Sequence, residues 1–249
     1  MKTNKYKGYF LLCGIICIIV LIGALLHKYY PIKDRVKNIE KYSKFSSKPV
    51  GWLRVQGTNI DMPIVYHESD VDLTNPEYDL GWTYSKYKTL PNRMVVVSHN
   101  VLNVSSTPII GDKNHRRFEQ LMSYVYYDFV KENKYVQYTT KGKNYLYKIY
   151  AISFQKENDV YLEDMKQKDI SIYASQQKQQ SYFNFKVDVK DDDKLITLIT
   201  CTRFFGNADY SFVVDARKVR NGESVRNYSV YKNTNYNKIE KKLKGDDKK

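Results

Sequence analysis

Residues 194–203 read KLITLITCTR, and the stretch YSFVVDAR follows at 210–217. The first stretch mixes apolar residues with threonines, namely Leu195, Leu198 and Ile199 with Thr197 and Thr200. An acidic turn, Asp191–Asp193, precedes it, so the pattern predicts a buried strand that ends on the thiol of Cys201. Such a cysteine is either a small buried hydrophobe or a nucleophile fixed at a strand end.

Further short strands are expected on both sides of this stretch, at 50–55, 60–66, 94–97, 134–140 and 143–155. After the N-terminal apolar run, helices are expected at 32–45, 116–124 and 164–182, and residues 67–92 are interpreted as a long surface loop with room for one short helix. Short strands with turn signals, few helices and no regular alternation of strand and helix favour a closed, mainly-β barrel with added helices.

Three local motifs resemble the sortases, cysteine transpeptidases of Gram-positive cell surfaces, and most of all the class B sortases. They are GWLRVQGTNIDMPIV at 51–65, VVVSHN at 95–100, and TLITC at 197–201 with the strand after it. The resemblance covers roughly residues 32–220. It implies an eight-stranded barrel with an N-terminal helix and another helix inserted before the cysteine strand.

The cysteine count supports a reactive thiol. Cys13 and Cys17 lie in an apolar run near the N-terminus, so Cys201 is the one cysteine of the remaining chain and has no partner for an internal disulfide. A lone thiol at the end of a threonine-rich strand is therefore interpreted as the nucleophile.

A cysteine nucleophile needs an acid–base partner, and His99 is the best candidate. It ends an apolar strand as Cys201 does, and two strand ends can hold an imidazole and a thiol together. It also matches the strand-end histidine of the sortases, followed by Asn. His67 has no counterpart in that family, and His115 lies in a polar segment beside two arginines.

The third catalytic group of the sortases is an arginine about eight to ten residues after the cysteine. Here residues 207–212 read NADYSF, without an arginine. Arg203 is the closest guanidinium, and it is predicted to stabilise the oxyanion. Arg217 would lie about 20 Å along the strand from the required place, which is too far.

The resemblance implies cleavage of a C-terminal sorting signal after Thr. The acyl group would then pass to an amine of the cell wall or to a pilin lysine. No cofactor is implied, and the histidines and Asp runs lack metal-ligand spacing. Two alternatives remain open: a weak or inactive sortase-like envelope assembly protein, and an L,D-transpeptidase-type enzyme, whose Cys-x-Arg is present but whose Ser-x-Gly-Cys is not.

The N-terminal segment predicts a membrane protein. Residues 9–26 form an uncharged apolar run behind three lysines, which favours a transmembrane anchor over a cleaved signal peptide and places the catalytic domain outside the cell. The expected divisions are a cytoplasmic N-terminus at 1–8, the anchor, a helical linker at 27–49, a catalytic domain at 50–227, and a charged, disordered tail at 228–249.

The net charge of +14 fits an anionic cell surface. Nucleic acid is not an expected partner, because no basic stripe interleaved with aromatics lies on a recognisable nucleic-acid-binding motif.

Overall fold

The computed structural model describes residues 15–18 and 49–245, without 76, 85, 87–88, 101–117, 141–142, 161, 163, 207–208 and 227. Contacts divide the chain into two units, Met1–Lys33 with Ser224–Asn227 and Asp34–Glu223 with Tyr228–Lys249. In the first unit, residues 15–18 are helical and exposed. Most of the expected anchor at 9–26 and the linker at 27–49 lie outside the described residues. Within the described part of the chain, no helix has the length and apolar character needed to cross a membrane.

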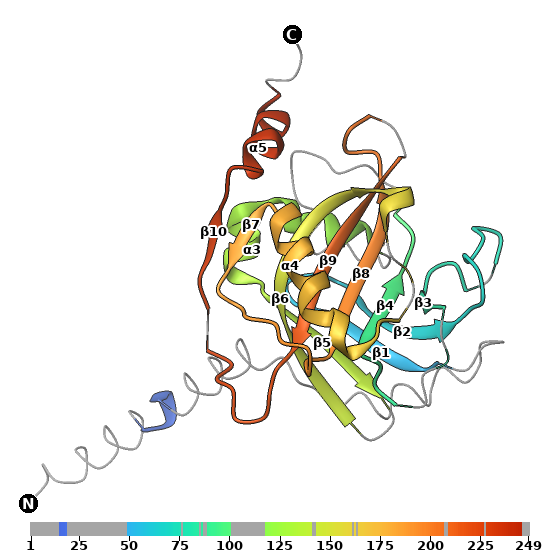
Figure 1. Cartoon of the computed structure of the whole chain (residues 1–249), viewed down its shortest axis with the longest axis horizontal. Coiled ribbons are helices and arrows are strands. Elements are labelled where there is room, and N and C mark those ends of the chain that lie inside the picture. Colours follow the sequence, from blue (N-terminus) through green and yellow to red (C-terminus); the bar gives the residue numbers. More distant parts are fainter. Residues whose placement is uncertain are drawn as a thin grey trace, which may run out of the picture. The chain divides into compact units, whose positions relative to one another are not determined.

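The second unit is a closed barrel of eight strands in the order β1-β2-β3-β4-β8-β9-β6-β5 (Figure 1). Its strands are β1 Gly51–Val55, β2 Asp61–Tyr66, β3 Gly81–Thr83, β4 Arg93–Val97, β5 Tyr135–Thr140, β6 Lys143–Lys156, β8 Leu195–Thr202 and β9 Tyr210–Lys218. The predicted eight-stranded, mainly-β barrel is therefore confirmed.

Strand β8 is buried on both faces up to the residue before Cys201. One face, with Ile196 and Leu198, belongs to the large core that fills the barrel. The other face carries Ile199, which joins a second apolar cluster with Val71 and Trp82. A strand lying parallel to its neighbour and covered on both faces needs a nearly continuous apolar sequence, which explains the composition of residues 195–200.

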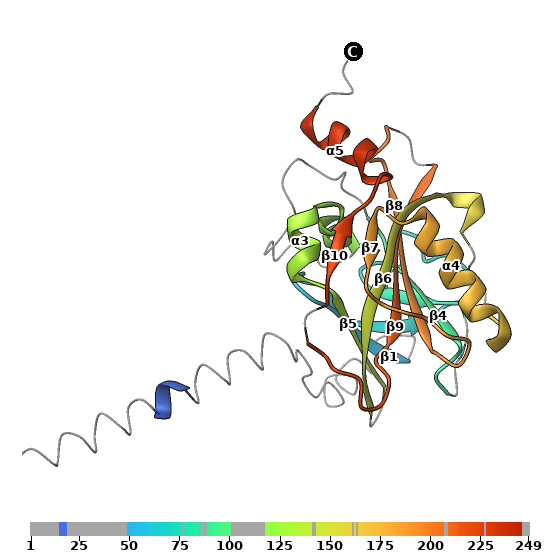
Figure 2. The ribbon, with the colours of Figure 1, turned by 60° about the vertical axis from the view of Figure 1, so that its left-hand side comes forward.

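Helices cover the outside and one end of the barrel: η1 Phe118–Val125, α3 Tyr127–Glu132, η2 Glu157–Asp159, η3 Gln167–Asp169 and α4 Ile170–Gln180. Figure 2 shows α4 along the outer face of the barrel, where it packs against β6. Its Tyr173 donates a hydrogen bond to the buried Asp215 of β9 at 2.9 Å. The helix expected within 164–182 is thus present and is pinned to the sheet that carries Cys201.

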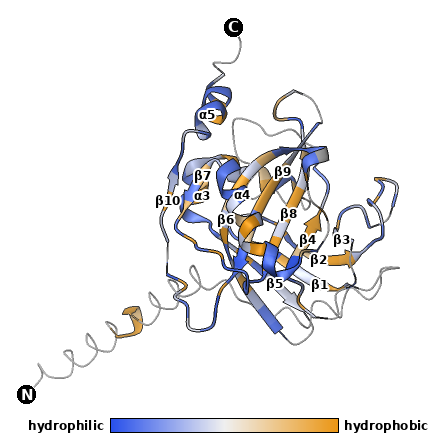
Figure 3. Ribbon diagram, in the orientation of Figure 1, coloured by the Kyte–Doolittle hydropathy of each residue, from blue (hydrophilic) through white to orange (hydrophobic). Residues whose placement is uncertain are grey.

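Two regions differ from the sequence prediction. The segment expected as a loop at 67–92 contains β3, which completes the barrel between β2 and β4. The tail expected to be disordered at 228–249 contains β10 Val230–Lys232, which pairs with β7 Phe183–Phe185, and the helix α5 Tyr236–Lys244. Tyr236 and Ile239 are buried, and Gly245 ends the helix in the left-handed conformation. Figure 3 shows α5 as mostly hydrophilic, and the contacts of Tyr236, Ile239 and Leu243 with the core dock this helix.

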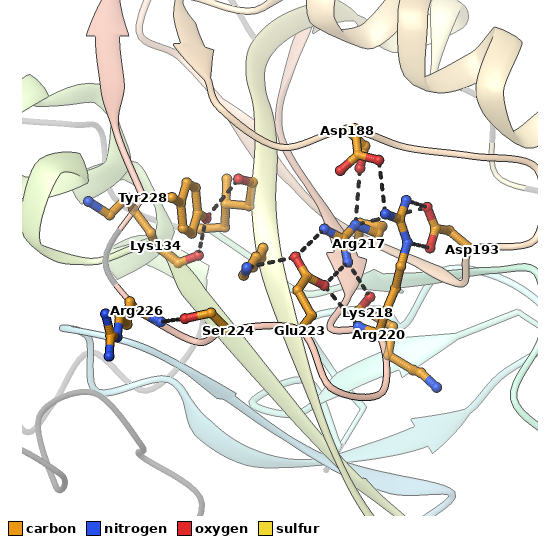
Figure 4. A network of polar contacts seen from close by, with 12 residues as sticks. Lys134, Asp188, Asp193, Arg217, Lys218, Arg220, Glu223, Ser224, Arg226 and Tyr228 are labelled. Carbon is orange, nitrogen blue, oxygen red and sulfur yellow. Dashed lines mark hydrogen bonds and ion pairs between the residues drawn. The ribbon is translucent and has the colours of Figure 1, made fainter.

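A polar network fixes the chain beyond β9 (Figure 4). Glu223 accepts hydrogen bonds from both terminal nitrogens of Arg217 and from Lys148 Nζ at 2.7 Å. Arg220 donates to both carboxylate oxygens of Asp193, at 2.8 and 2.6 Å. The bond from Arg217 is the main reason that the pKa of Glu223 lies far below its usual range. The network is structural, and it occupies the guanidinium of Arg217.

Candidate active site

The register of two neighbouring strands brings His99 and Cys201 together. Strands β4 and β8 are parallel, with Val97 beside Ile199. Continuing the pairing by two residues places His99 beside Cys201, and the Ser98 amide still donates to the Ile199 carbonyl at 3.3 Å. Adjacent strands lie about 4.8 Å apart, and paired residues of a parallel ladder share a face of the sheet. The sequence prediction that two strand ends carry the pair therefore fits the topology.

Side-chain hydrogen bonds hold these two strand ends against each other. The Thr200 hydroxyl donates to the Ser98 carbonyl at 2.8 Å, and the Asn100 amide donates to the Cys201 carbonyl at 3.0 Å. The Ser98 hydroxyl in turn donates to the Leu80 carbonyl at 3.0 Å. The backbone on both sides of the His99–Cys201 pair is thus cross-linked and kept in register.

The orientation of His99 fixes its tautomer. Its Nε2 lies 2.6 Å from the Val71 carbonyl, and its ring lies 5.0 Å from the Trp82 ring. A carbonyl can only accept, so Nε2 carries the hydrogen and Nδ1 is the nitrogen left to exchange a proton. Asp72 follows Val71, and its pKa is lowered mainly by hydrogen bonds from Thr74 and to a smaller degree by the charge of His99.

The thiol of Cys201 is exposed but lies among carboxylates. Partial burial raises its pKa, and the charges of Glu157 and Asp70 raise it further. Asp70 accepts a short hydrogen bond from the Tyr84 hydroxyl. The pKa of Tyr84 is itself raised, chiefly by burial and by that hydrogen bond. An acidic pair thus stands beside the thiol of a strongly basic chain, and it disfavours the thiolate until a positive group approaches.

Neither arginine considered from the sequence takes the place of the expected one. Cys201 pairs across β8 and β9 with Ser211, which is buried, so a serine stands on the neighbouring strand. Arg203 is exposed just after β8, and its carbonyl accepts from the Gly206 amide in a turn. Arg217 pairs with Leu195, six residues of β9 away from Ser211, and its guanidinium is bound to Glu223. At about 20 Å along a strand, Arg217 cannot reach the thiol.

His67 is the other histidine that the structure describes, and it has a different partner. His67 lies at the end of β2, where its Nε2 is 2.7 Å from a carboxylate oxygen of the buried Glu77. That pair anchors the segment that carries Val71 and covers the outer apolar cluster. His115 lies outside the described residues. Among the residues that the structure does describe, no His, Cys, Asp and Glu side chains are grouped to hold a metal ion.

Several residues around the site were not identified from the sequence. Asn100 was visible as the residue after His99, but its bond to the Cys201 carbonyl depends on the strand register. Glu157 and Asp70 lie 44 and 131 residues before Cys201, and no local pattern distinguishes them from surface carboxylates. The tertiary fold alone brings these charges to the thiol.

Comparisons with known proteins agree with this geometry. A family model describing a sortase domain matches residues 53–219. The chain is 21% identical over 193 residues to Sortase B of Staphylococcus aureus, covering 76% of each chain, and 25% identical over 182 residues to Sortase B of Listeria monocytogenes, covering 68% of each. Among solved structures it resembles Sortase B of Clostridium perfringens, with a TM-score of 0.59, 21% identity, and coverage of 74% of this chain and 99% of that one.

Proposed function

Because the chain belongs to the sortase family and is a class B-like transpeptidase, we propose that Cys201 is its nucleophile and His99 its acid–base group. The observation that supports this proposal is the parallel register of β4 and β8, whose last pair, Val97 and Ile199, stands two residues before His99 and Cys201. A thiol and an imidazole in that position have the relation that nucleophilic catalysis by cysteine requires.

The proposed reaction has two half-reactions. The Cys201 thiolate attacks the carbonyl after a Thr in the sorting signal, and a carbon–sulfur bond forms. The peptide carbon–nitrogen bond then breaks as His99 Nδ1 gives its proton to the departing amine, which leaves a thioacyl enzyme. The incoming amine attacks that thioacyl carbon and loses a proton to the same nitrogen, so the thiolate is released and the imidazolium restored.

We assign the stabilisation of the oxyanion to Arg203. It follows the nucleophile by two residues and is exposed at the end of β8. A guanidinium is a charged, forked donor, which suits an oxygen that gains negative charge in the transition state. Its positive charge would also oppose the effect of Glu157 and Asp70 on the thiol.

The proposed substrates are surface proteins or pilins with a C-terminal sorting signal, and the proposed acceptor is an amine of the cell wall or of a pilin lysine. One of the related structures is a Staphylococcus aureus sortase B–substrate complex, which supports a peptide donor. We also propose that residues 9–26 anchor the enzyme in the membrane, with 1–8 in the cytoplasm and the catalytic domain, over 50–227, outside. The apolar run and the preceding lysines support this orientation.

A second candidate function is a weak or inactive sortase-like protein in envelope assembly. Two observations favour it: Ser211 stands opposite Cys201 where the family places an arginine, and carboxylates raise the pKa of the thiol. Both would slow formation of the thioacyl enzyme without changing the fold.

The transpeptidase and the assembly protein can be distinguished by measuring turnover of a peptide library in which one position is fixed as Thr. The soluble domain is mixed with the library and an amine acceptor, and the transfer products are sequenced by mass spectrometry. The proposed enzyme yields products joined after Thr, Cys201→Ala and His99→Ala yield none above about one part in 10³, and His67→Ala retains activity. Wild-type protein that binds the peptides without joining them would support the assembly function instead.

A further inference from the structure

A polar groove of about 620 Å³ lies near the end of the barrel that carries the thiol. Its walls come from the end of β6, the end of α4, the start of β9 and the C-terminal helix α5. Amide side chains line it together with aromatic ones, namely Gln155, Gln179, Gln180 and Asn235 with Phe154, Tyr182 and Tyr210. Charge is supplied by Asp159 and Lys156 and, from α5, by Lys238. The amide side chains can bind the amide groups of a hydrophilic ligand, and the charged side chains can bind its ionised ends.

Strand register places this groove close to the thiol. Cys201 pairs with Ser211, and Ser211 pairs with Gln155, so the three residues form one row across β8, β9 and β6. Cys201 and Gln155 are therefore separated by two strand spacings, a distance of about 10 Å. That distance corresponds to about three extended peptide residues. A molecule bound in the groove can therefore reach Cys201 with one end.

The two sides of Cys201 differ in chemistry. On the β3 and β4 side stand the aromatic rings of Trp82 and Tyr84 with the apolar cluster. On the β9 and β6 side lies the groove, and Glu157, whose charge acts on the thiol, lies two residues before the groove residue Asp159 in the short helix η2. A transpeptidase must present two different substrates to one sulfur, and two unlike surfaces provide for this.

We propose that the groove binds the acceptor of the second half-reaction, a peptide-like molecule with a free amine directed to Cys201 and a carboxylate bound by Lys238. This inference rests on the proposed function. Glu157 and Asp70 attract the ammonium form of the amine, since their charges already act at the thiol. The glutamine and asparagine side chains bind the amide groups of the acceptor body.

The C-terminal segment is part of this site. Asn235 donates through its side chain to the carbonyls of Gln179 and Ser181, both at 3.0 Å, which ties the start of α5 to the end of α4. Lys242 lies 5.7 Å from the centre of the Phe204 ring, in the turn after β8. Residues beyond the family-matched range at 53–219 thus complete a wall of the groove.

The test compares three acceptors for the same thioacyl enzyme: trialanine, hydroxylamine and water. Hydroxylamine is small enough to react without a groove, and water reports the donor half-reaction alone. Lys238→Glu should raise the KM for trialanine about fivefold, and Gln180→Trp, which fills the groove, should raise it at least as much. Transfer to hydroxylamine and hydrolysis should stay unchanged. Lys241→Glu makes the same charge change on the exposed part of α5 outside the lining and should leave all three rates as they are.

The binding of trialanine is also followed by NMR on the Cys201→Ala protein, so that the groove is tested even if no thioacyl enzyme forms. Absence of thioacyl formation in the wild type contradicts the proposed function, whereas shifts of groove residues weakened by Lys238→Glu still support the site. Two results overturn the inference. One is an equal KM for trialanine in wild type, Lys238→Glu and Gln180→Trp. The other is a parallel loss with all three acceptors, which would show that α5 only positions the turn after β8.

Discussion

Cys201 is exposed at the end of a strand whose preceding residues are buried, and its reactivity is set by neighbours from distant parts of the sequence. Burial and two carboxylates hold the pKa of the thiol above its ordinary value. The thiolate is therefore scarce at neutral pH unless a positive group is close. We propose that protonated His99 and Arg203 supply this positive charge.

Glu157→Gln should lower the pKa of the Cys201 thiol, because it removes the negative charge that raises this pKa more than the charge of Asp70 does. The thiolate fraction at pH 7 rises, so alkylation by iodoacetamide becomes faster and its pH profile moves to lower pH. The rate is followed from pH 5 to 10 in wild type and variant. Asp192→Asn, in the exposed turn before β8, is the matched control and should leave the profile in place. A profile unchanged by Glu157→Gln would remove the electrostatic account of this thiol.

The roles of the two arginines can be separated by substitution. Arg203→Ala should lower turnover by about 10²–10³, the loss expected for one oxyanion donor. Arg203→Lys should not restore it, since an ammonium lacks the forked geometry. Arg217→Ala should instead lower the melting temperature, because Arg217 is buried and bound to Glu223. Kinetics and thermal unfolding are measured on the same three proteins. Near-normal turnover in Arg203→Ala would reverse the assignment.

At the residue scale, the sequence pointed to the two side chains that we propose as the reacting pair, but not to their surroundings. His99 and Cys201 are recognisable because each ends an apolar strand, and strand ends are local features. The carbonyl of Val71 that orients His99, and the carboxylates that act on Cys201, come from segments without a pattern of their own. Such contacts follow from the closed barrel and could not be inferred before it was known.

At the scale of elements, the strands of five or more residues were predictable and the three-residue strands were not. Runs of apolar and β-branched residues predict β8 and β6. β3 has only three residues, and its place is set by pairing with β2 and β4 rather than by its own composition. Helix α5 was hidden because its two buried positions, Tyr236 and Ile239, are surrounded by lysines, so that its composition is typical of a disordered tail.

The network around Glu223 makes a prediction about the element that follows β9. Glu223→Gln should lower the free energy of unfolding at pH 7 by about 3 kcal/mol, since it leaves the buried charge of Arg217 without its main partner. Urea denaturation measures this change. Glu240→Gln, which alters an exposed ion pair with Lys232, is the control and should have little effect.

The sign of the pH dependence follows from the direction of the pKa shift. The pKa of Glu223 is lower in the folded protein than in the unfolded chain, where it is near 4.5. Its contribution to stability is therefore complete above pH 4.5 and is lost as the pH falls toward the folded value. Wild type and Glu223→Gln should differ by a constant amount above pH 5, and the difference should shrink progressively as the pH falls below 4.5. A difference that does not change with pH would contradict the role of this carboxylate.

At the scale of the whole molecule, a basic chain carries an acidic catalytic end. The net charge of +14 suits an anionic cell surface, whereas Glu157 and Asp70 make the surroundings of the thiol locally negative. The first property would hold the enzyme near the wall, and the second would attract an ammonium acceptor. The local charge depends on the barrel, because the β4–β8 register determines which side chains lie together at the end that carries the thiol.

The most direct test of this account is the intact mass of the protein after brief mixing with a Thr-containing donor peptide, without acceptor. Wild type and His67→Ala should gain the mass of the acyl fragment, and hydroxylamine should remove it, as expected for a thioester on Cys201. Cys201→Ala should gain nothing, and His99→Ala should gain it at least 10²-fold more slowly. An adduct that forms equally fast in His99→Ala, or one that persists in Cys201→Ala, would contradict the proposed pair.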